Sequence, residues 1–544
     1  MSELLEPVTA KRGRATESFP GSGWRGPRGQ VTVGNVAARV TGLLRVVAVG
    51  GALGTTYLGN TYQTANLVSN LLFELLAAGI LSSVLVPPFV ALLDADRRED
   101  AEHLAGAVLG VALAVLGAVT VVGLLARPWI MRALTVAVSD DAVRDAEVRL
   151  GGFLLLVFVP QILFYAISSV ATAVLHGSRR FAAASFAPVA NNLVVIATMV
   201  AFRVLTGGRG GLDLALSHRL VLALGTTAGV VAMAAVPVVA LRRAGIRLRP
   251  RWDPSHPALR ALGRAGAWGI VYLTMSQLLV AVTLVLANRV EGGVVAYHIA
   301  FTTFLLPFAL LAHPVLTTVY PGLAADAQAG RWAGFADALG RGARSIAFLV
   351  LPSAALLVAL AGPGLRLIQL GALDVAGSRL VAGALAAYAL GLAGYAGLHL
   401  LTRASYAAGD TRTPALVNVG VAVGGSALML VLATVASGSG RMVAIGVAHS
   451  VAMVAGAVAL GLSVRRRVGV AWPVGATIAR SLAGAVVAGL AAWGVADLLP
   501  AGGRLGAALA VGLGGAAGVG AYVLVEWALR APELTTSTVP EPAG

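Results

Sequence analysis

The chain alternates long apolar runs with short polar connections. From Val31 to Leu529 the apolar runs recur at lengths near 20 residues, and longer polar stretches are confined to the two tails and a few connections. About 20 apolar residues are what an α-helix needs to cross some 30 Å of hydrocarbon. The pattern therefore predicts an all-α integral membrane protein with about fourteen transmembrane helices, near residues 31–57, 62–92, 103–126, 150–175, 181–204, 220–241, 265–288, 294–320, 343–363, 379–402, 414–437, 441–464, 474–499 and 504–529.

Composition narrows the class further. Hydrophobic residues make up 58% of the 544 positions and charged residues only 12%. With a mean hydropathy of +0.85, these values exclude an ordinary soluble globular protein. The chain has no cysteine, which excludes disulfides, a thiolate metal site and a cysteine nucleophile. Its four histidines within apolar runs lack the i, i+4 spacing of a zinc-binding helix, so we expect packed or cavity-lining side chains, no metal and no cofactor.

The net charge of +16 would suggest a nucleic-acid partner in a soluble protein, but its distribution indicates membrane topology instead. Basic residues concentrate in every second connection, and both tails fall on that side. The opposite connections hold few, apart from the loop over 127–149, which mixes arginines with Asp140, Asp141, Asp145 and Glu147. The asymmetry predicts both termini in the cytoplasm. Residues 1–30, which lack a signal-peptide apolar core, are predicted to form a basic tail near anionic lipid.

Two segments of the chain resemble each other. A small basic turn leads to Pro188 and, four residues later, Asn192; a second such turn leads to Pro414 and, again four residues later, Asn418. The two prolines lie 226 residues apart, and two other segments at a similar separation show a weaker similarity. Basic turns followed by proline are common in cytoplasmic loops, so chance similarity is the alternative to duplication.

A duplication predicts two pseudo-symmetric lobes of six helices, over residues 31–243 and 264–467, related by an axis along the membrane normal. A basic linker over 244–263 joins them. A C-terminal helix pair over 468–530 has no counterpart in the repeat, and residues 531–544 form a second cytoplasmic tail.

Three charged residues stand inside the first two apolar runs. Arg39 and Arg45 lie in the first run and Glu74 in the second. An arginine at the centre of a membrane helix costs about 2.5–3.5 kcal/mol on insertion scales, so we expect something anionic to compensate. Six residues along a helix separate the two arginines by about 120° and roughly 9 Å, which lets both face one broad cavity. Snorkelling to an interface is the alternative, and it is easier for Arg39 than for Arg45.

Glu74 is the one acidic residue between Ser18 and Leu93, so we expect it to pair with one of the two arginines. Either it forms a structural salt bridge across the first hairpin, or it is a protonatable group that couples transport to ions. Asn70 lies one helical turn earlier and shares its face.

The segments that carry these residues resemble the MurJ/MviN family of lipid II flippases, within the MOP superfamily. The resemblance covers roughly residues 31–465, and fourteen spans are also typical of the family. The matching segments keep their order along the chain: Val40-Thr41-Gly42-Leu43-Leu44-Arg45 after Arg39, Ser69-Asn70-Leu71-Leu72 with Gly79, Arg180-Phe181 through Ala187-Pro188 to Asn192, Gln369-Leu370-Gly371, and Tyr406 with Asp410-Thr411-Arg412-Thr413-Pro414.

The resemblance implies a multi-pass flippase of the bacterial cytoplasmic membrane that moves a polyprenyl-pyrophosphate-linked peptidoglycan precursor between leaflets. Cavity arginines would receive the pyrophosphate, with a lipid-linked oligosaccharide, membrane lipids and cell-wall synthesis proteins as partners. The predicted substrate-binding residues are Arg39, Arg45, Asn70, Glu74 and Asn192.

The chain departs from the family at several charged positions. It has Asn60, Phe73 and Ala78 where the family has charged residues in the opening hairpin, and Phe301 and Thr302 where it has an acid and an arginine. These losses keep open a transporter of another lipid-linked polysaccharide and a degenerate regulatory paralogue.

The ion that drives transport is also open. The seventh span lacks a carboxylate in its apolar core, so the sodium site known in some family members cannot be carried over directly. Asp410 and Ser426 are the candidate ion-coupling residues, and both H⁺ and Na⁺ stay open as the coupling ion.

A membrane glycosyltransferase or polymerase is the rival from the enzyme class. Such enzymes need acidic residues on a sizeable external loop, whereas the largest external connection here, 127–149, carries an Asp140/Asp141 pair better suited to solvation or helix capping. We therefore expect a transporter without covalent chemistry.

Overall fold

The computed structural model describes residues 27–534 except 75–88, 94, 96, 209, 256–266, 370 and 500–502. Every long element among these residues is helical, which confirms the all-α prediction. The helices are α1 (Pro27–Leu53), α2 (Tyr57–Phe73), α4 (Arg98–Leu134), α5 (Asp141–Phe158), α6 (Gln161–Gly177), α7 (Phe181–Thr206), α8 (Leu216–Arg243), α10 (Ala267–Asn288), α11 (Gly293–Pro307), the π-helical η2 (Phe308–Ala312), α12 (His313–Gln328), α13 (Trp332–Leu367), α14 (Val375–Ala389), α15 (Leu392–Ala407), α16 (Arg412–Val435), α17 (Gly440–Val468), α18 (Gly475–Asp497), α19 (Gly503–Ala528) and the 3₁₀-helical η3 (Pro532–Leu534).

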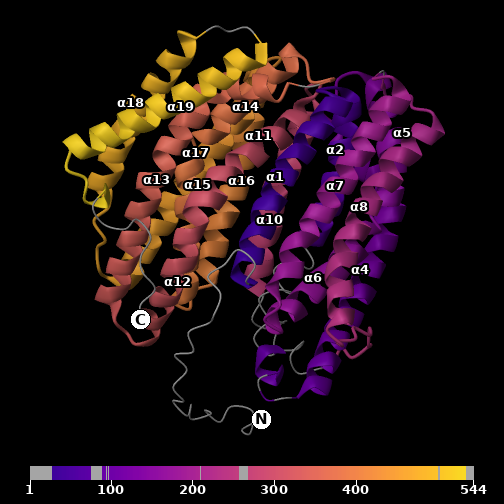
Figure 1. The fold of residues 1–544 in the computed structure, drawn as a ribbon, viewed down its shortest axis with the longest axis horizontal. Coiled ribbons are helices and arrows are strands. Elements are labelled where there is room, and N and C mark those ends of the chain that lie inside the picture. Colours follow the sequence, from indigo (N-terminus) through magenta and orange to yellow (C-terminus); the bar gives the residue numbers. More distant parts are fainter. Residues whose placement is uncertain are drawn as a thin grey trace.

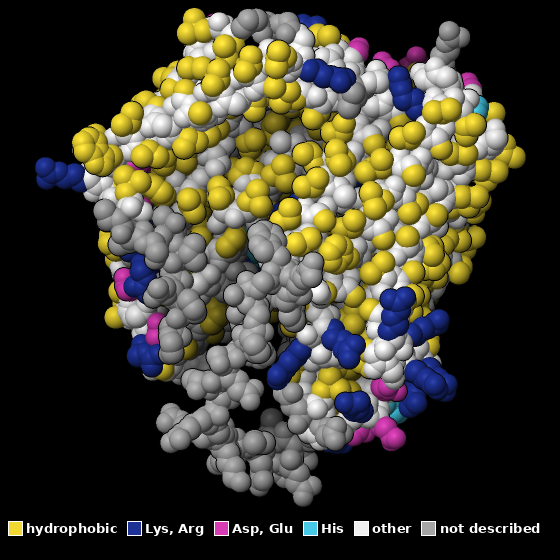
Figure 2. Space-filling view, viewed as in Figure 1, with side chains coloured by type: hydrophobic (Ala, Val, Ile, Leu, Met, Phe, Trp, Pro, Cys, Tyr) yellow, Lys and Arg dark blue, Asp and Glu magenta, His cyan; other side chains and the backbone are white. Residues whose placement is uncertain are grey.

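The number of membrane spans is close to the predicted fourteen. Among the described residues, 12 helical stretches are long and apolar enough to cross a membrane, or 13 if α14 and α15, which meet at 46°, form one bent span. The remaining predicted span, 62–92, begins as α2 and continues into residues 75–88, which lie outside the described residues. Figure 2 shows the matching surface, with a broad hydrophobic belt and arginines gathered toward the lower end of the view.

The predicted external loop over 127–149 is wrong in extent. Helix α4 continues to Leu134 and α5 begins at Asp141, so the connection is only residues 135–140. The arginines and acids between the two apolar cores extend the helices instead of interrupting them. Asp140 is the N-cap of α5 and accepts hydrogen bonds from the backbone N–H groups of Ala142 (2.8 Å) and Val143 (3.1 Å), as the capping interpretation predicts.

The same packing pattern occurs twice. In the first half of the chain, α1–α8, helix α7 packs on α1 and α8; in the second half, α10–α17, helix α16 packs on α10 and α17. Figure 1 shows the two halves side by side, the first in indigo to magenta and the second in rose to orange. Asn192 Nδ2 donates to Thr41 Oγ1 in α1 (3.1 Å), and Asn418 Nδ2 donates to Ser276 Oγ in α10 (2.9 Å). These matched bonds support the two-lobe division proposed from the repeat.

The C-terminal helices α18 and α19 pack on α13 of the second half, at the outer edge in Figure 1. Tyr522 of α19 donates a hydrogen bond to the carbonyl of Phe348 in α13 (2.7 Å). Arg480 of α18 pairs with the buried carboxylates of Glu526 (2.6 Å) and Glu533. This ionic cluster holds η3 and both helices together.

The two halves are joined at the end of the molecule where α1 ends and α2 begins. Asn60 of α2 donates to the carbonyl of Val290 (2.9 Å) and accepts from the N–H of Val294 (3.0 Å) in the second half. Asn288 at the end of α10 shares a hydrogen bond with Thr64 of α2 (3.2 Å). We call this contact of α2 with the α10–α11 turn the junction. Asn60 stands where the MurJ/MviN family has a charged residue, and here its neutral amide connects the two halves.

The loop after α13 reinforces the junction. The N–H of Ala372 donates to the carbonyl of Gly51 in α1 (2.8 Å). Gly54 has a φ of +67°, and a Cβ there would lie 2.7 Å from the carbonyl oxygen of Ala372. Only glycine therefore permits both the turn after α1 and this close approach.

Candidate functional site

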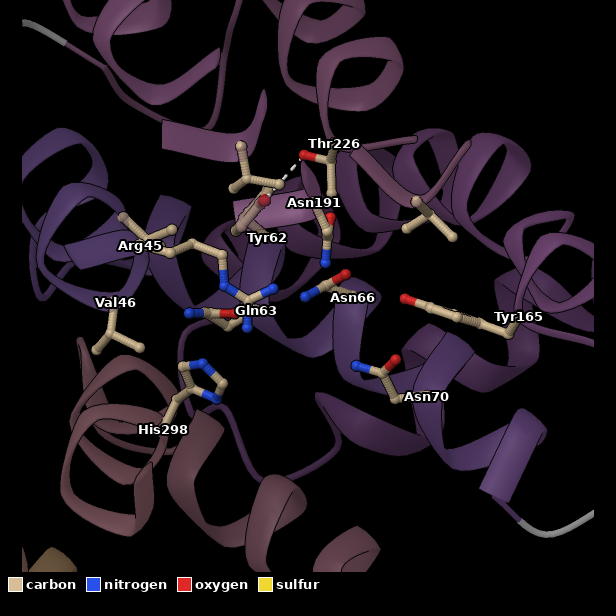
Figure 3. A pocket seen from close by; sticks show the side chains of 13 residues that line it. Arg45, Val46, Tyr62, Gln63, Asn66, Asn70, Tyr165, Asn191, Thr226 and His298 are labelled. Atoms are coloured by element: carbon tan, nitrogen blue, oxygen red, sulfur yellow. Dashed lines mark hydrogen bonds between the residues drawn. The ribbon is translucent and has the colours of Figure 1, made fainter. Parts of the chain in front are cut away.

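A cavity of about 170 Å³ lies inside the first half, between α1, α2, α6, α7 and α8, and His298 of α11 in the second half also lines it. Figure 3 shows its polar side chains pointing toward one another. The lining consists of Arg45, Val46, Val49, Tyr62, Gln63, Asn66, Asn70, Tyr165, Asn191, Val195, Thr226, Val230 and His298.

The polar lining has one cation and no acidic side chain. Around the guanidinium of Arg45 stand four amides, two phenols, a hydroxyl and the imidazole of His298. Arg45 is half-buried and forms no hydrogen bond or ion pair with any residue of the described chain. An arginine in a membrane segment without a protein counter-charge, among hydrogen-bond donors, has the chemistry to bind an anion.

Helical spacing explains how the sequence builds this wall. Gln63, Asn66 and Asn70 follow one another at three and four residues, so they occupy one face of α2. Arg45 and Val49, four residues apart, occupy the facing stripe of α1. The amides therefore line the cavity because the polar positions of α2 match the helical period.

One side of the cavity is held rigidly. Tyr62 and Thr226 share a hydrogen bond of 2.8 Å, drawn dashed in Figure 3. Because the Thr226 hydroxyl donates to the carbonyl of Leu222 (2.7 Å), the phenol of Tyr62 is the donor of this bond. Tyr62 also meets Phe158 edge to face, with ring centroids 5.9 Å apart. Helices α2, α5 and α8 are thereby fixed against one another behind the amides.

Arg45 and Asn70 are the predicted site residues that the structure brings together in this cavity. Arg39 lies elsewhere: its side chain is exposed and its guanidinium donates to the carbonyl of Ala309 in η2 (3.4 Å). There its charge and that of Arg403 both act on His313, which follows the π-helical turn. Arg39 thus belongs to a separate basic group between the halves.

The predicted ion pair of Glu74 is wrong. Glu74 caps the C-terminal end of α2, is exposed, and makes no ion pair with Arg39 or Arg45 in the described chain. Figure 3 places Arg45 beside Gln63, and Glu74 lies eleven residues further along α2, or about 16 Å. Arg45 and Glu74 are therefore far apart along the axis of α2.

Asn192 is wrong as a cavity residue, and its neighbour Asn191 lines the cavity instead. Asn192 instead binds α1: its Nδ2 donates to the carbonyl of Ala38 (3.3 Å) and to the hydroxyl of Thr41 (3.1 Å). Its repeat counterpart Asn418 does the same in the second half, and this pairing was the signal for a structural role.

Asp410 and Ser426 are not brought together. Asp410 accepts from the N–H of Thr413 (2.9 Å) before α16 and pairs with Arg467 (2.9 Å). Ser426 is buried more than three turns into α16, about 20 Å further. Burial by itself raises the pKa of the Asp410 carboxyl, but the hydrogen bonds from Thr413 and the charge of Arg467 bring it below its ordinary value. Asp410 is a capping and pairing residue here, and the two residues do not form one ion site.

Further residues were missed from the sequence. Gln63, Asn66 and Tyr165 line the cavity, but they carry no charge, so nothing distinguished them from packed residues of the apolar runs. Glu147, expected in a solvated loop, is fully buried in α5. Its burial follows from the extension of α5 beyond its apolar core.

In the second half, aromatic side chains pack at the place where the MurJ/MviN family has an acid and an arginine. Phe301 stacks on Phe304 (5.4 Å between centroids) and meets Tyr388 (5.7 Å) and His449 (5.7 Å) edge to face. This cluster is hydrophobic core and offers no charge to an anion.

Comparison with known proteins identifies a family of similar sequences. The family model "Lipid II flippase MurJ" matches residues 49–511. A probable lipid II flippase MurJ of Rhizobium tropici is 27% identical over 449 residues, covering 81% of each chain. The lipid II flippase MurJ of Burkholderia cenocepacia is 25% identical over 404 residues, covering 71% of this chain and 74% of that protein.

Solved structures show the same fold. A lipid II flippase MurJ in an inward closed conformation superposes with a TM-score of 0.72 at 19% identity, covering 93% of this chain and 99% of that one. An inward-facing multidrug resistance MATE transporter of the MOP superfamily gives 0.64 at 15% identity, covering 79% and 94%.

Proposed function

Because the chain belongs to the lipid II flippase MurJ family, we propose that it moves lipid II, a polyprenyl-pyrophosphate-linked glycan, from the inner to the outer leaflet of the bacterial cytoplasmic membrane. The observation that carries the proposal is the cavity, where Arg45 has no protein counter-charge and no acidic side chain shares the lining. Transport by this route requires binding and movement only, without covalent chemistry.

The head group of such a lipid fits the cavity through its phosphates. A guanidinium binds two phosphate oxygens with its planar fork, and the amides of Gln63, Asn66 and Asn70 donate to the remaining oxygens. A volume of about 170 Å³ is below the roughly 300–1,000 Å³ of pockets that enclose drug-sized ligands. We therefore place the pyrophosphate in this cavity, the glycan between the halves and the polyprenyl chain in lipid.

The junction supplies the gate for alternating access. With both termini in the cytoplasm, as the charge asymmetry indicates, the junction faces the outside and the present conformation is closed there. Opening to the outside breaks the bonds of Asn60 to Val290 and Val294 and the bond between Thr64 and Asn288. The halves then rock about the bound head group.

A growth assay tests the proposal. In a bacterium depleted of its own lipid II flippase, we expect this chain to restore growth and Arg45→Ala to fail, at equal amounts in the membrane. Arg441→Ala is the matched control, because Arg441 lies outside the cavity and donates to the carbonyl of Ala436 (3.1 Å) at the start of α17. Wild-type chain that inserts but never restores growth would contradict lipid II as the cargo and favour another polyprenyl-linked glycan.

A further inference from the structure

Glu147 is a buried carboxyl without a counter-charge beside the junction. Its side chain is 0% exposed between α2 and α5. Oε1 lies 3.1 Å from the hydroxyl of Thr61, and Oε2 has no hydrogen-bond partner. It makes no ion pair in the described part of the chain, and nothing in the transport cycle outlined above uses it. We propose that Glu147 is a proton-binding site whose occupancy holds the junction closed, a proposal that rests on the proposed alternating-access function.

Burial requires the neutral form of this carboxyl. An ionised carboxylate loses its hydration when it is buried and is tolerated only when a cation or several hydrogen bonds replace that water. Glu147 has neither, since a single hydroxyl is its hydrogen-bond partner. The closed conformation therefore needs a proton on Glu147.

The hydrogen-bond geometry around Thr61 fits a protonated partner. The Thr61 hydroxyl lies 2.8 Å from the carbonyl of Tyr57, one turn earlier in α2, and 3.1 Å from Glu147 Oε1. A hydroxyl has a single proton, and the shorter contact to a carbonyl uses it. The longer contact is then satisfied when the carboxyl of Glu147 donates its own proton to the Thr61 oxygen.

The ionisable groups around Glu147 do not replace that proton. The phenol of Tyr57 lies close enough for the charges of Glu147, Glu291 and Asp140 to act on it, so these neighbours are neutral or acidic. On α5 itself, Arg144 is paired with the exposed Asp141 (2.8 Å).

The helices that pack on α5 bring basic groups that are engaged elsewhere or exposed. On α8, Arg219 donates to the carbonyl of Leu214 (2.7 Å) and His218 meets the ring of Phe202 edge to face (6.3 Å). On α4, Arg127 donates to the carbonyl of Leu124 (3.2 Å) and Arg132 is exposed. Arg149 of α5 is exposed, Arg289 of the α10–α11 turn is half-buried, and neither forms an ion pair with Glu147 in the described chain. A proton is thus the positive charge that we assign to Glu147.

Thr61 connects this proton to the gate. It stands next to Asn60 and three residues before Thr64, the two α2 residues that bond across the junction. When the junction opens, the α10–α11 turn leaves the face of α2 that carries Asn60 and Thr64, and water reaches the neighbouring contact of Thr61 with Glu147. The carboxyl then ionises, and the junction closes again only after a proton from the outside returns. Acidic conditions outside favour the closed state.

The absence of native cysteines allows a direct test. Ala287→Cys places a thiol in the last turn of α10, at a fully buried position beside the junction. Its labelling by an impermeant thiol reagent from outside is normalised to Ser437→Cys, at an exposed position. In otherwise wild-type chain we expect normalised labelling to rise with pH, by up to about tenfold per unit for a one-proton equilibrium.

Glu147→Gln, permanently neutral, should remove this rise and keep Ala287→Cys protected at every pH. Thr61→Val, which loses the acceptor for the Glu147 proton, should move the rise to lower pH, and it serves if Glu147→Gln does not fold. A rise that is the same in wild type, Glu147→Gln and Thr61→Val would overturn the proposal. The labelling uses no lipid II, so its failure leaves the proposed function standing, and a chain that labels as expected but moves no lipid II refutes that function alone.

Discussion

Replacing Arg45 tests the anion site with a single side chain. Arg45→Ala removes the charge and both prongs of the fork, whereas Arg45→Lys keeps the charge alone. Because Arg45 makes no hydrogen bond or ion pair within the described chain, its loss should leave the fold intact. Both variants are expected to insert and fold like wild type, and both should bind lipid II more weakly.

The size of the loss follows from the contacts the cavity offers. A hydrogen bond to a charged group is worth about 1.5–3 kcal/mol, so Arg45→Ala should weaken binding by roughly ten- to a hundredfold. Lysine keeps one charged donor and should recover part of this loss. Asn70→Ala removes a neutral donor to a charged phosphate oxygen, a bond at the lower end of this range, about 1.5 kcal/mol, which corresponds to roughly tenfold.

The assay is binding of a polyprenyl-pyrophosphate glycan to detergent-purified variants matched for thermal stability. Arg441→Ala controls for the loss of an arginine outside the cavity and should bind like wild type. Undiminished binding by Arg45→Ala would refute the reasoning that an unpaired cavity arginine holds the phosphates.

Three further predictions address the frame around this site. Asn192→Ala and Asn418→Ala should each lower the melting temperature without changing affinity for the lipid, because both amides bond the first helix of their half; a lost affinity in purified Asn192→Ala would return Asn192 to the cavity. Since the folded pKa of Asp410 lies below its unfolded value, its stabilisation is present above the unfolded pKa, about 3.9, and is lost as pH falls through the folded pKa; wild type should therefore be more stable than Asp410→Asn at neutral pH and converge with it in acid. Ser178→Cys should be shielded from an impermeant thiol reagent in intact cells while Ser437→Cys reacts, and the reverse pattern would overturn the orientation.

The sequence predicted the helices well because hydrophobic length is a local property. It also found Arg45, because a charge in an apolar run is costly wherever the helix turns. The sequence does not show which way a neutral amide points. Asn191 and Asn192 are adjacent and project about 100° apart on α7. Packing decides that Asn191 lines the cavity and that Asn192 binds α1.

Other misses concern helix ends and pairing across space. Arginines and acids over 127–149 suggested a loop, yet they extend α4 and α5 and carry Glu147 into a buried position. Glu74 was expected to meet an arginine because charges in hydrocarbon seek partners. Glu74 lies eleven residues beyond Gln63 along α2, too far to reach Arg45, and the Arg39 guanidinium donates to the carbonyl of Ala309 instead.

Movement of lipid II by the purified chain is the most direct test of the account. Proteoliposomes that carry lipid II in both leaflets can be treated with an impermeant enzyme that modifies only the outer glycan. With wild-type chain we expect nearly all of the lipid II to become accessible over time, whereas Arg45→Ala and protein-free vesicles should stop at the outer-leaflet fraction. Wild-type chain that is folded, inserted and confined to the outer-leaflet fraction would contradict the proposed transport of lipid II.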